Sequence, residues 1–136
     1  MNTKRWLFAT LAGFVVYAVL QMVLHGMLLG DLYKQTASVW RPEAQMHSLM
    51  WLLWLSYLIA AAMLAFIYAK GYEPGKSSLG QGVRFGVYAG ILIATLMSLG
   101  SYFSLPVPGV LALYWFIGWL IITVAVGAAI GVIYRR

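Results

Sequence analysis

The sequence predicts an all-α polytopic membrane protein, an antiparallel bundle of four transmembrane helices. Of its 136 residues, 63% are hydrophobic and 9% are charged, whereas soluble domains average about 45–50% and about 25%. Too few polar residues are present to cover a globule in water, and the mean hydropathy of +0.87 has the same implication. The alternating pattern of a transmembrane barrel is absent, so we expect helices to carry the apolar surface.

Four apolar runs are each long enough to cross a bilayer. About 20 helical residues span a hydrocarbon core about 30 Å thick. Pro42 and Glu43 form a helix-start signal ahead of the second run and extend it outward. The expected helices cover residues 6–29, 42–69, 83–103 and 110–134, which together form one transmembrane domain over residues 1–136.

The connections between these helices carry turn signals. Residues 70–82 are rich in Gly, Ser and Lys around Pro74 and Gly75, so we expect a plain solvated connector. Prolines at 106 and 108 separate the third and fourth helices and predict a tight hairpin. The first connection, residues 30–48, is the longest and carries charged, aromatic and histidine side chains.

The distribution of Lys and Arg predicts the topology. With four spans, both termini and the second connection share one face, which carries seven basic residues against two, Lys34 and Arg41, on the other. Cytoplasmic loops retain such residues, so both termini are expected in the cytoplasm. The net charge of +6 is then explained by topology and by membrane lipids as partners, and nucleic acid is not expected. The seven are Lys4, Arg5, Lys70, Lys76, Arg84, Arg135 and Arg136.

Small residues recur every four positions on the cytoplasmic halves of the helices. Such tracks let helix backbones approach closely in a membrane, where dispersion rather than the hydrophobic effect drives helices together. We therefore expect tight packing at the cytoplasmic end and splaying toward the outer leaflet. The expected packing glycines are Gly82, Gly86 and Gly90 in the third helix and Gly127 and Gly131 in the fourth.

Larger aromatic and polar residues occupy the outer ends of the helices. On the second helix, His47, Trp51 and Trp54 fall on one face with Leu58 and Ala61, at about 100° per residue. These side chains are typical of an interfacial aromatic belt with core filling, and the alternative is a ligand pocket. The candidate ligand-binding residues are Tyr17, Gln21, His25, His47, Trp51, Trp54, Tyr102, Trp115 and Trp119.

The two histidines are the candidate metal ligands. We expect His25 and His47 at similar depth on adjoining helices, with both imidazoles pointing inward beside tryptophans. Two imidazoles can ligate haem iron or, with Asp31 or Glu43, a divalent metal. The alternative is a neutral histidine hydrogen-bonded to a neighbour. Gln21 is expected to form a hydrogen bond to the third helix, at Thr95, Ser98 or Tyr102.

Several classes of membrane protein do not fit the residues. No cysteine occurs, which excludes thiol redox chemistry of the vitamin K quinone reductase type. No carboxylate lies within the apolar, membrane-crossing parts of the expected helices, because Glu43 belongs to the outward extension of the second. Proton-coupled antiport of the small multidrug type therefore lacks its glutamate. The Arg, Asn and Glu set of membrane glutathione transferases is also missing. No catalytic residue is therefore assigned.

Three segments, HGMLLGDLY, RFGVYAGIL and AVGAAIGVIYRR, resemble a family of small bacterial four-helix inner-membrane proteins of unknown function. The resemblance implies a location in the bacterial inner membrane and implies no activity.

The leading functional hypothesis is a non-catalytic membrane protein. It would bind a lipidic or hydrophobic ligand in the outer half of the bundle, or act as an accessory subunit of a larger membrane complex or homo-oligomer. One alternative is a haem- or metal-binding protein that uses His25 and His47. Another is a small-solute transporter without a membrane carboxylate.

Overall fold

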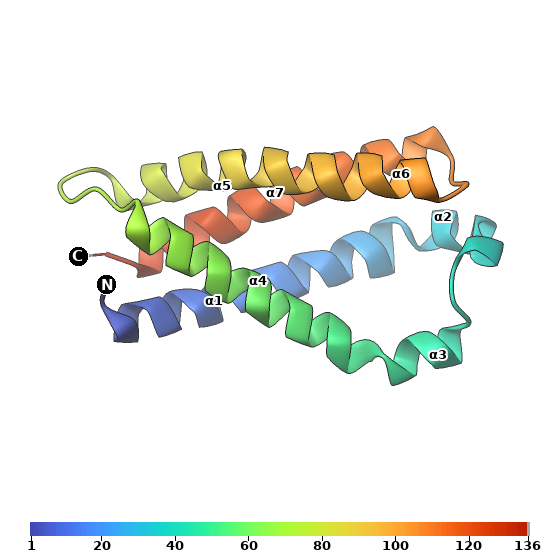
Figure 1. Ribbon diagram of the computed structural model, residues 1–136, viewed down its shortest axis with the longest axis horizontal. Helices are drawn as coiled ribbons and strands as arrows, with labels where there is room; N and C mark the ends of the chain where they lie inside the picture. Colours follow the sequence, from blue (N-terminus) through green and yellow to red (C-terminus); the bar gives the residue numbers. More distant parts are fainter. Residues whose placement is uncertain (136) are drawn as a thin grey trace.

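The computed structural model describes residues 1–135 as an all-α four-helix bundle. Four helices are long and apolar enough to cross a membrane, which confirms the expected fold class and a multi-pass membrane protein. They run antiparallel, and both chain termini lie at the same end (Figure 1). The spans are Thr3–Leu28, Met50–Lys70, Ser78–Ser104 and Gly109–Ile133.

Two of the four spans are interrupted by π-helical turns, and the first connection is itself helical. The first span consists of α1 (Thr3–Gln21) and the π-helix η1 (Met22–Leu28). The third consists of α5 (Ser78–Ala94), the π-helix η3 (Thr95–Leu99) and α6 (Gly100–Ser104), and the fourth is α7 (Gly109–Ile133). The connection contains α2 (Gly30–Gln35), the 3₁₀ turn η2 (Ala37–Val39) and α3 (Glu43–Ser48), which precede α4 (Met50–Lys70).

The second expected helix differs from the observed one. It begins near Pro42 as expected, but it breaks at Leu49, whose backbone has φ −99° and ψ 3°. The Ser48 hydroxyl donates to the Gln45 carbonyl at 2.7 Å, and the Leu49 N–H bonds back to Met46 at 3.1 Å. These bonds close the short helix α3 before α4 starts.

The third helix starts earlier than expected, at Ser78. Ser77 caps it, since its side-chain oxygen accepts a hydrogen bond from the Gly80 N–H at 3.2 Å.

Helices α5 and α7 pack with their backbones in contact. A Cβ added to Gly86 would lie 2.7 Å from the Val124 Cα, and one on Gly127 would lie 2.8 Å from the Gly86 Cα. A Cβ on Gly131 would lie 2.9 Å from the Gly82 Cα. Only glycine tolerates such an approach, so the small residues of the two helices form one shared interface.

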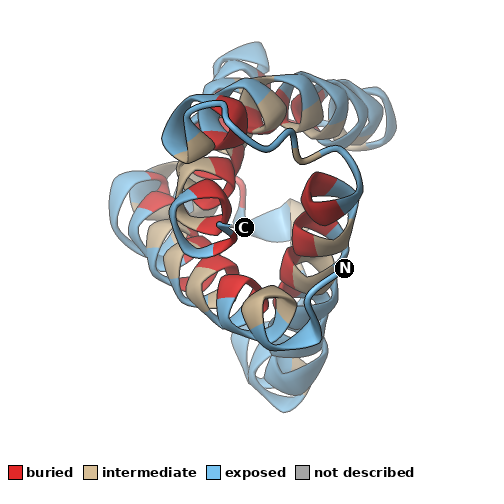
Figure 2. Cartoon of the chain, turned by 90° about the vertical axis from the view of Figure 1, so that its left-hand side faces the viewer, coloured by how far each residue is buried: buried red, intermediate tan, exposed pale blue. Residues whose placement is uncertain are grey.

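Helix α1 packs against both α4 and α7. Ala61 and Ala65 of α4 are completely buried, and the Trp6 indole N–H donates to the Ala62 carbonyl across the helix pair at 3.1 Å. On the other side, a Cβ on Gly13 would touch Ile130 at 3.3 Å. Seen along the bundle from the terminal end, the buried residues face inward on all four helices (Figure 2).

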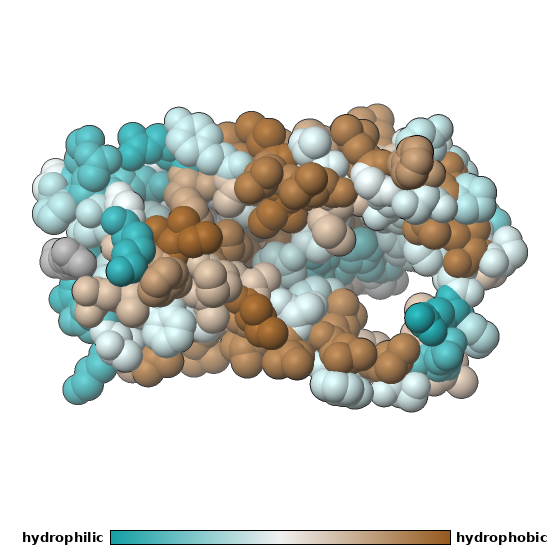
Figure 3. All heavy atoms as spheres, in the orientation of Figure 1, coloured by the Kyte–Doolittle hydropathy of each residue, from teal (hydrophilic) through white to brown (hydrophobic). Residues whose placement is uncertain are grey.

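Helix α4 leaves the bundle in its first turns, at the end opposite the chain termini. Its buried residues begin at Tyr57, and every residue from Met50 to Ser56 is exposed, although seven helical residues cover all sides of a helix. Residues 43–48 of α3 are exposed as well. Figure 3 shows a hollow at the end opposite the termini, bounded on one side by α3 and the start of α4. The expected splaying is therefore concentrated in one helix.

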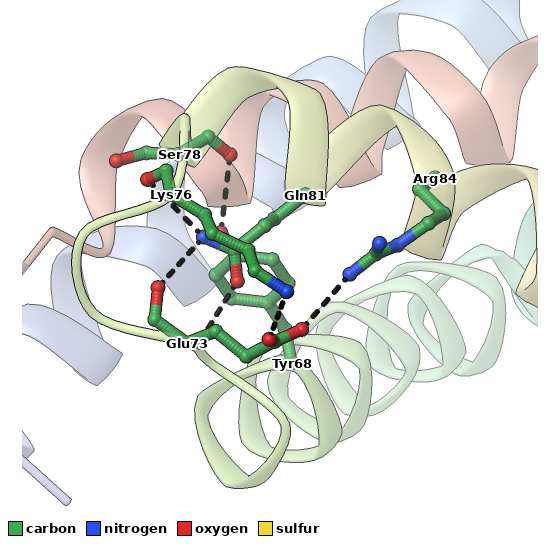
Figure 4. A network of polar contacts seen from close by, with 6 residues as sticks. All are labelled: Tyr68, Glu73, Lys76, Ser78, Gln81 and Arg84. Atoms are coloured by element: carbon green, nitrogen blue, oxygen red, sulfur yellow. Dashed lines mark hydrogen bonds and ion pairs between the residues drawn. The ribbon is translucent and has the colours of Figure 1, made fainter.

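The connection between α4 and α5 is a bonded structure rather than the plain solvated connector expected from its composition. Gln81 is buried, its side-chain N–H groups donate to the carbonyls of Glu73 and Lys76 at 3.0 and 3.3 Å, and its side-chain oxygen accepts from the Glu73 N–H at 2.8 Å (Figure 4). The Tyr68 hydroxyl donates to the Ser78 carbonyl at 3.1 Å. One buried glutamine thus holds the loop backbone closed.

The only carboxylate in this loop is neutralised by two cations. Glu73 is paired with Lys76 and, at 3.2 Å, with Arg84 (Figure 4). The hydrogen bond and charge of Lys76, followed by those of Arg84, lower the pKa of the Glu73 carboxyl.

We predict that Gly86→Ala lowers the free energy of unfolding by about 2 kcal/mol or more, because its Cβ would enter the backbone of α7. Gly100→Ala is the control, since nothing lies within 4 Å of a Cβ at that helical glycine. It should leave stability unchanged or raise it by about 0.5–1 kcal/mol through helix propensity. Unfolding in mixed detergent micelles, followed by circular dichroism, measures both. Equal stability of the two variants would contradict the backbone contact.

Candidate functional site

An aromatic cluster lies in the half of the bundle opposite the chain termini. Its rings form one continuous series of contacts, with centroid separations from 5.0 to 6.4 Å. Five separate elements contribute to it, so its shape depends on the whole bundle. The members of this aromatic cluster are Phe14, Tyr17, His25, Tyr33, Trp40, Trp54, Tyr57, Trp115 and Trp119.

Tyr33 is the polar centre of the cluster. Its hydroxyl accepts a hydrogen bond from the buried Trp115 indole N–H at 2.8 Å and lies 2.5 Å from Nδ1 of His25. Burial raises the pKa of the Tyr33 hydroxyl, against a smaller lowering by the Trp115 bond. The hydroxyl is therefore protonated at neutral pH, and it links the first span, α2 and α7.

This arrangement sets the hydrogen-bonding roles of His25. Because the Tyr33 hydroxyl already accepts from Trp115, its own hydrogen is directed to Nδ1 of His25. A neutral imidazole that accepts at Nδ1 carries its hydrogen at Nε2. We assign this tautomer from the bonding network. The Nε2–H group is thus the hydrogen-bond donor of His25 that Tyr33 does not engage.

A second small network holds the end of α2. The Trp40 indole N–H donates to the Thr36 hydroxyl at 2.9 Å, and that hydroxyl donates to the Leu32 carbonyl at 2.8 Å. The Trp40 ring lies edge-on to both Tyr33 and Trp115, at 5.4 and 6.0 Å. The short helix α2 is therefore fixed over the end of α7.

Gln21 is buried beside the cluster without a bonding partner. Its side chain is 1% exposed, and neither amide atom has a hydrogen-bond partner among the described residues. The Tyr17 hydroxyl one turn earlier approaches the amide without reaching good bonding geometry. The expected bond to the third helix is wrong, and the Ser98 hydroxyl there also lacks a described partner. An unbonded buried amide costs about 1–3 kcal/mol.

The π-helical turn η1 presents His25. Wider turns of this kind are frequent at functional sites because they change the direction of side chains within a helix. Gln21 immediately precedes η1, and Ser98 lies in the second π-helix, η3. Both spans are thus irregular toward the end of the bundle opposite the termini.

The structure brings six of the nine sequence-derived candidates together. Tyr17 contacts both Tyr57 and Trp119, at centroid distances of 5.0 and 6.0 Å. The imidazole of His25 lies 6.4 Å from the Trp119 ring. The six are Tyr17, Gln21, His25, Trp54, Trp115 and Trp119.

The other three candidates lie outside the aromatic cluster. His47 is exposed on α3, and its Nε2 lies 3.6 Å from Glu43, so the expectation that it points inward is wrong. Trp51 is 61% exposed, because the first turns of α4 have left the bundle. Tyr102 is 49% exposed near the α6–α7 turn, where its hydroxyl would lie 3.8 Å from a Cβ on Gly109.

The two histidines do not form a common site. No hydrogen bond or ring contact among the described residues joins His25 to His47, and α3 lies apart from the end of the first span (Figure 1). No group of three or more His, Cys, Asp and Glu side chains is arranged for a metal within residues 1–135. Nδ1 of His25 is also engaged by Tyr33.

Four cluster members were absent from the sequence-derived candidates: Phe14, Tyr33, Trp40 and Tyr57. Tyr33 and Trp40 belong to the first connection, and their contacts with Trp115 span most of the chain, so local spacing gave no signal. Tyr57 had a signal, since it lies four residues before the small residue Ala61. The expected face passed through Leu58 instead, which is 43% exposed.

Comparison of the chain with protein-family models, with curated proteins and with solved structures gives no match.

We predict that Tyr33→Phe lowers the free energy of unfolding by about 1–3 kcal/mol, because the Trp115 N–H and His25 Nδ1 both lose their bonding partner. Tyr102→Phe is the matched control, because the hydroxyl of this half-exposed residue takes part in none of the hydrogen bonds described here. Thermal unfolding in detergent compares the two. A Tyr33→Phe variant as stable as Tyr102→Phe would refute the central role of the hydroxyl.

We predict opposite effects for two glutamines. Gln21→Leu should raise the free energy of unfolding by about 1 kcal/mol, since it removes an unbonded buried amide. Gln81→Leu should lower it by about 2 kcal/mol, since three hydrogen bonds to the loop backbone are lost. The same unfolding assay measures both. Destabilisation by Gln21→Leu would mean that its amide is bonded.

Proposed function

We propose that this protein is a non-catalytic component of the bacterial inner membrane that binds an amphipathic lipid at the aromatic cluster. In this proposal both termini lie in the cytoplasm and the cluster lies in the outer half of the bilayer. The excess of Lys and Arg on the terminal face supports that orientation.

The observation that carries the proposal is the opening created where α4 leaves the bundle. The hollow lies at the end of the bundle opposite the termini (Figure 3), and several cluster members are incompletely covered, since His25 and Trp119 are partly buried and Trp54 is exposed. An opening between transmembrane helices faces acyl chains, so a lipid can reach the cluster from the side. The exposed side chains at the start of α4 are themselves apolar, which suits contact with lipid.

The chemistry of the cluster indicates which end of a lipid it suits. Aromatic faces pack against hydrocarbon or another ring, while the Nε2–H of His25 donates a hydrogen bond. In the membrane a polar group needs an internal partner, and a carbonyl or hydroxyl oxygen on the ligand would supply one. The ligand class is therefore a lipid whose polar end accepts a hydrogen bond.

The distribution of carboxylates favours binding over proton-coupled transport. The chain has three acidic residues, and all three, Asp31, Glu43 and Glu73, lie in the connections between spans. Glu73 is already paired with Lys76 and Arg84. No carboxylate within a span is available to carry protons or cations.

The test is lipid bound to the purified protein, measured by native mass spectrometry. We predict that His25→Phe, which keeps an aromatic ring but removes the donor, loses most of the lipid that copurifies with the wild type. His47→Phe makes the same substitution on the exposed histidine and should retain it. Equal retention by both variants would contradict the proposal, as would a wild type without bound lipid.

A second candidate function is that of an accessory subunit. It is favoured by the exposure of α3 and the start of α4: residues 43–56 are all exposed except Leu49, which is partly buried. The same purification distinguishes the two functions, because a stoichiometric membrane protein bound through this stretch would be lost in Trp51→Ala. A Soret band in the optical spectrum would instead favour haem at His25.

A further inference from the structure

We propose a second lipid site at the opposite end of the bundle, where a groove beside α1 binds an anionic phospholipid from the membrane. In this site Arg5 holds the phosphate and one acyl chain lies along α1. The site is independent of the aromatic cluster.

The groove is a shallow, open apolar depression with one cation among its lining residues. It has a volume of about 560 Å³ and is formed by α1 and by Ile133 at the end of α7. The cation is Arg5, which is partly buried at one end of the groove. The apolar lining consists of Phe8, Leu11, Ala12, Val15, Val16 and Ile133.

The length of the groove matches one acyl chain. The lining runs from Arg5 to Val16, which at about 1.5 Å per residue is about 16 Å along the helix. Half of a hydrocarbon core of about 30 Å is about 15 Å. A chain that starts at the level of Arg5 therefore reaches the middle of the bilayer within the groove.

The charge around Arg5 selects an anionic head group. The ion pairs found among residues 1–135 do not include Arg5. Lys4 precedes it, and Arg135 lies near the same end because the Asn2 N–H donates to the Tyr134 hydroxyl at 3.3 Å. A zwitterionic head group would bring its ammonium toward these cations, whereas an anionic phosphodiester brings no positive charge.

Two other cations at this end already have a carboxylate partner. Lys76 and Arg84 share the carboxylate of Glu73 (Figure 4). Lys70 lies over the Phe66 ring, 5.2 Å from its centroid, outside the groove. Arg5 thus lines the apolar groove and has no carboxylate partner among residues 1–135. Lys70 carries the same charge outside the groove, so it supplies the control.

The experiment titrates the purified protein with phosphatidylglycerol or phosphatidylethanolamine of identical acyl chains and counts bound lipid by native mass spectrometry. The wild type should prefer phosphatidylglycerol. Arg5→Gln should weaken phosphatidylglycerol binding about tenfold, the effect of losing a hydrogen bond to a charged group, and abolish the preference. Lys70→Gln should leave both unchanged.

A second variant tests the groove separately from the charge. Ala12→Phe fills the groove and should reduce binding of both lipids, whereas Ala44→Phe, on the exposed surface of α3, should not. Wild-type binding and preference in either Arg5→Gln or Ala12→Phe would overturn the site. An equal loss in Lys70→Gln would also overturn it, since binding would then follow overall charge.

Discussion

The backbone contact between α5 and α7 is the constraint on which the rest of the bundle depends. Gly82, Gly86, Gly127 and Gly131 leave no space for a Cβ, so these two helices have one close arrangement. Helix α1 packs on α7, and α4 packs mainly on α1, with few contacts to α7. Helix α4 is therefore the least anchored span, and the opening forms where its last contacts, Phe14 with Trp54 and Tyr17 with Tyr57, end.

Polar groups next to that opening need partners, because hydrocarbon supplies none. Most of them satisfy one another: Tyr33 bonds to both His25 and Trp115, and Trp40 bonds to Thr36. The Gln21 amide and the Ser98 hydroxyl are exceptions, since neither has a described partner. Their destabilising effect is tolerated because the α5–α7 contact and the alanine packing of α1 on α4 stabilise the remainder of the bundle.

The sequence predicts the spans and the fold class well, because length and hydropathy alone decide whether a helix crosses a bilayer. It predicts faces poorly, since α1, α4 and α7 are apolar on all sides and lipid-facing residues resemble buried ones. That is why the expected face of α4 passed through Leu58 rather than Tyr57, and why His47 was placed inside. The Tyr33–Trp115 bond joins residues 82 positions apart, so no local pattern contains it.

The central claim is that α4 leaves the bundle before Tyr57. The chain contains no cysteine, so single cysteines introduced at each position from 50 to 65 can carry a spin label in lipid vesicles without removing a native thiol. Collision with dissolved oxygen then measures how far each label contacts lipid. The structure predicts high collision rates at positions 50–53, 55 and 56, partial protection at 54, where Trp54 meets Phe14, and a helical period with protected positions from 57 onward. A protected face that continues through residues 50–56 would contradict the opening and, with it, lateral entry to the aromatic cluster.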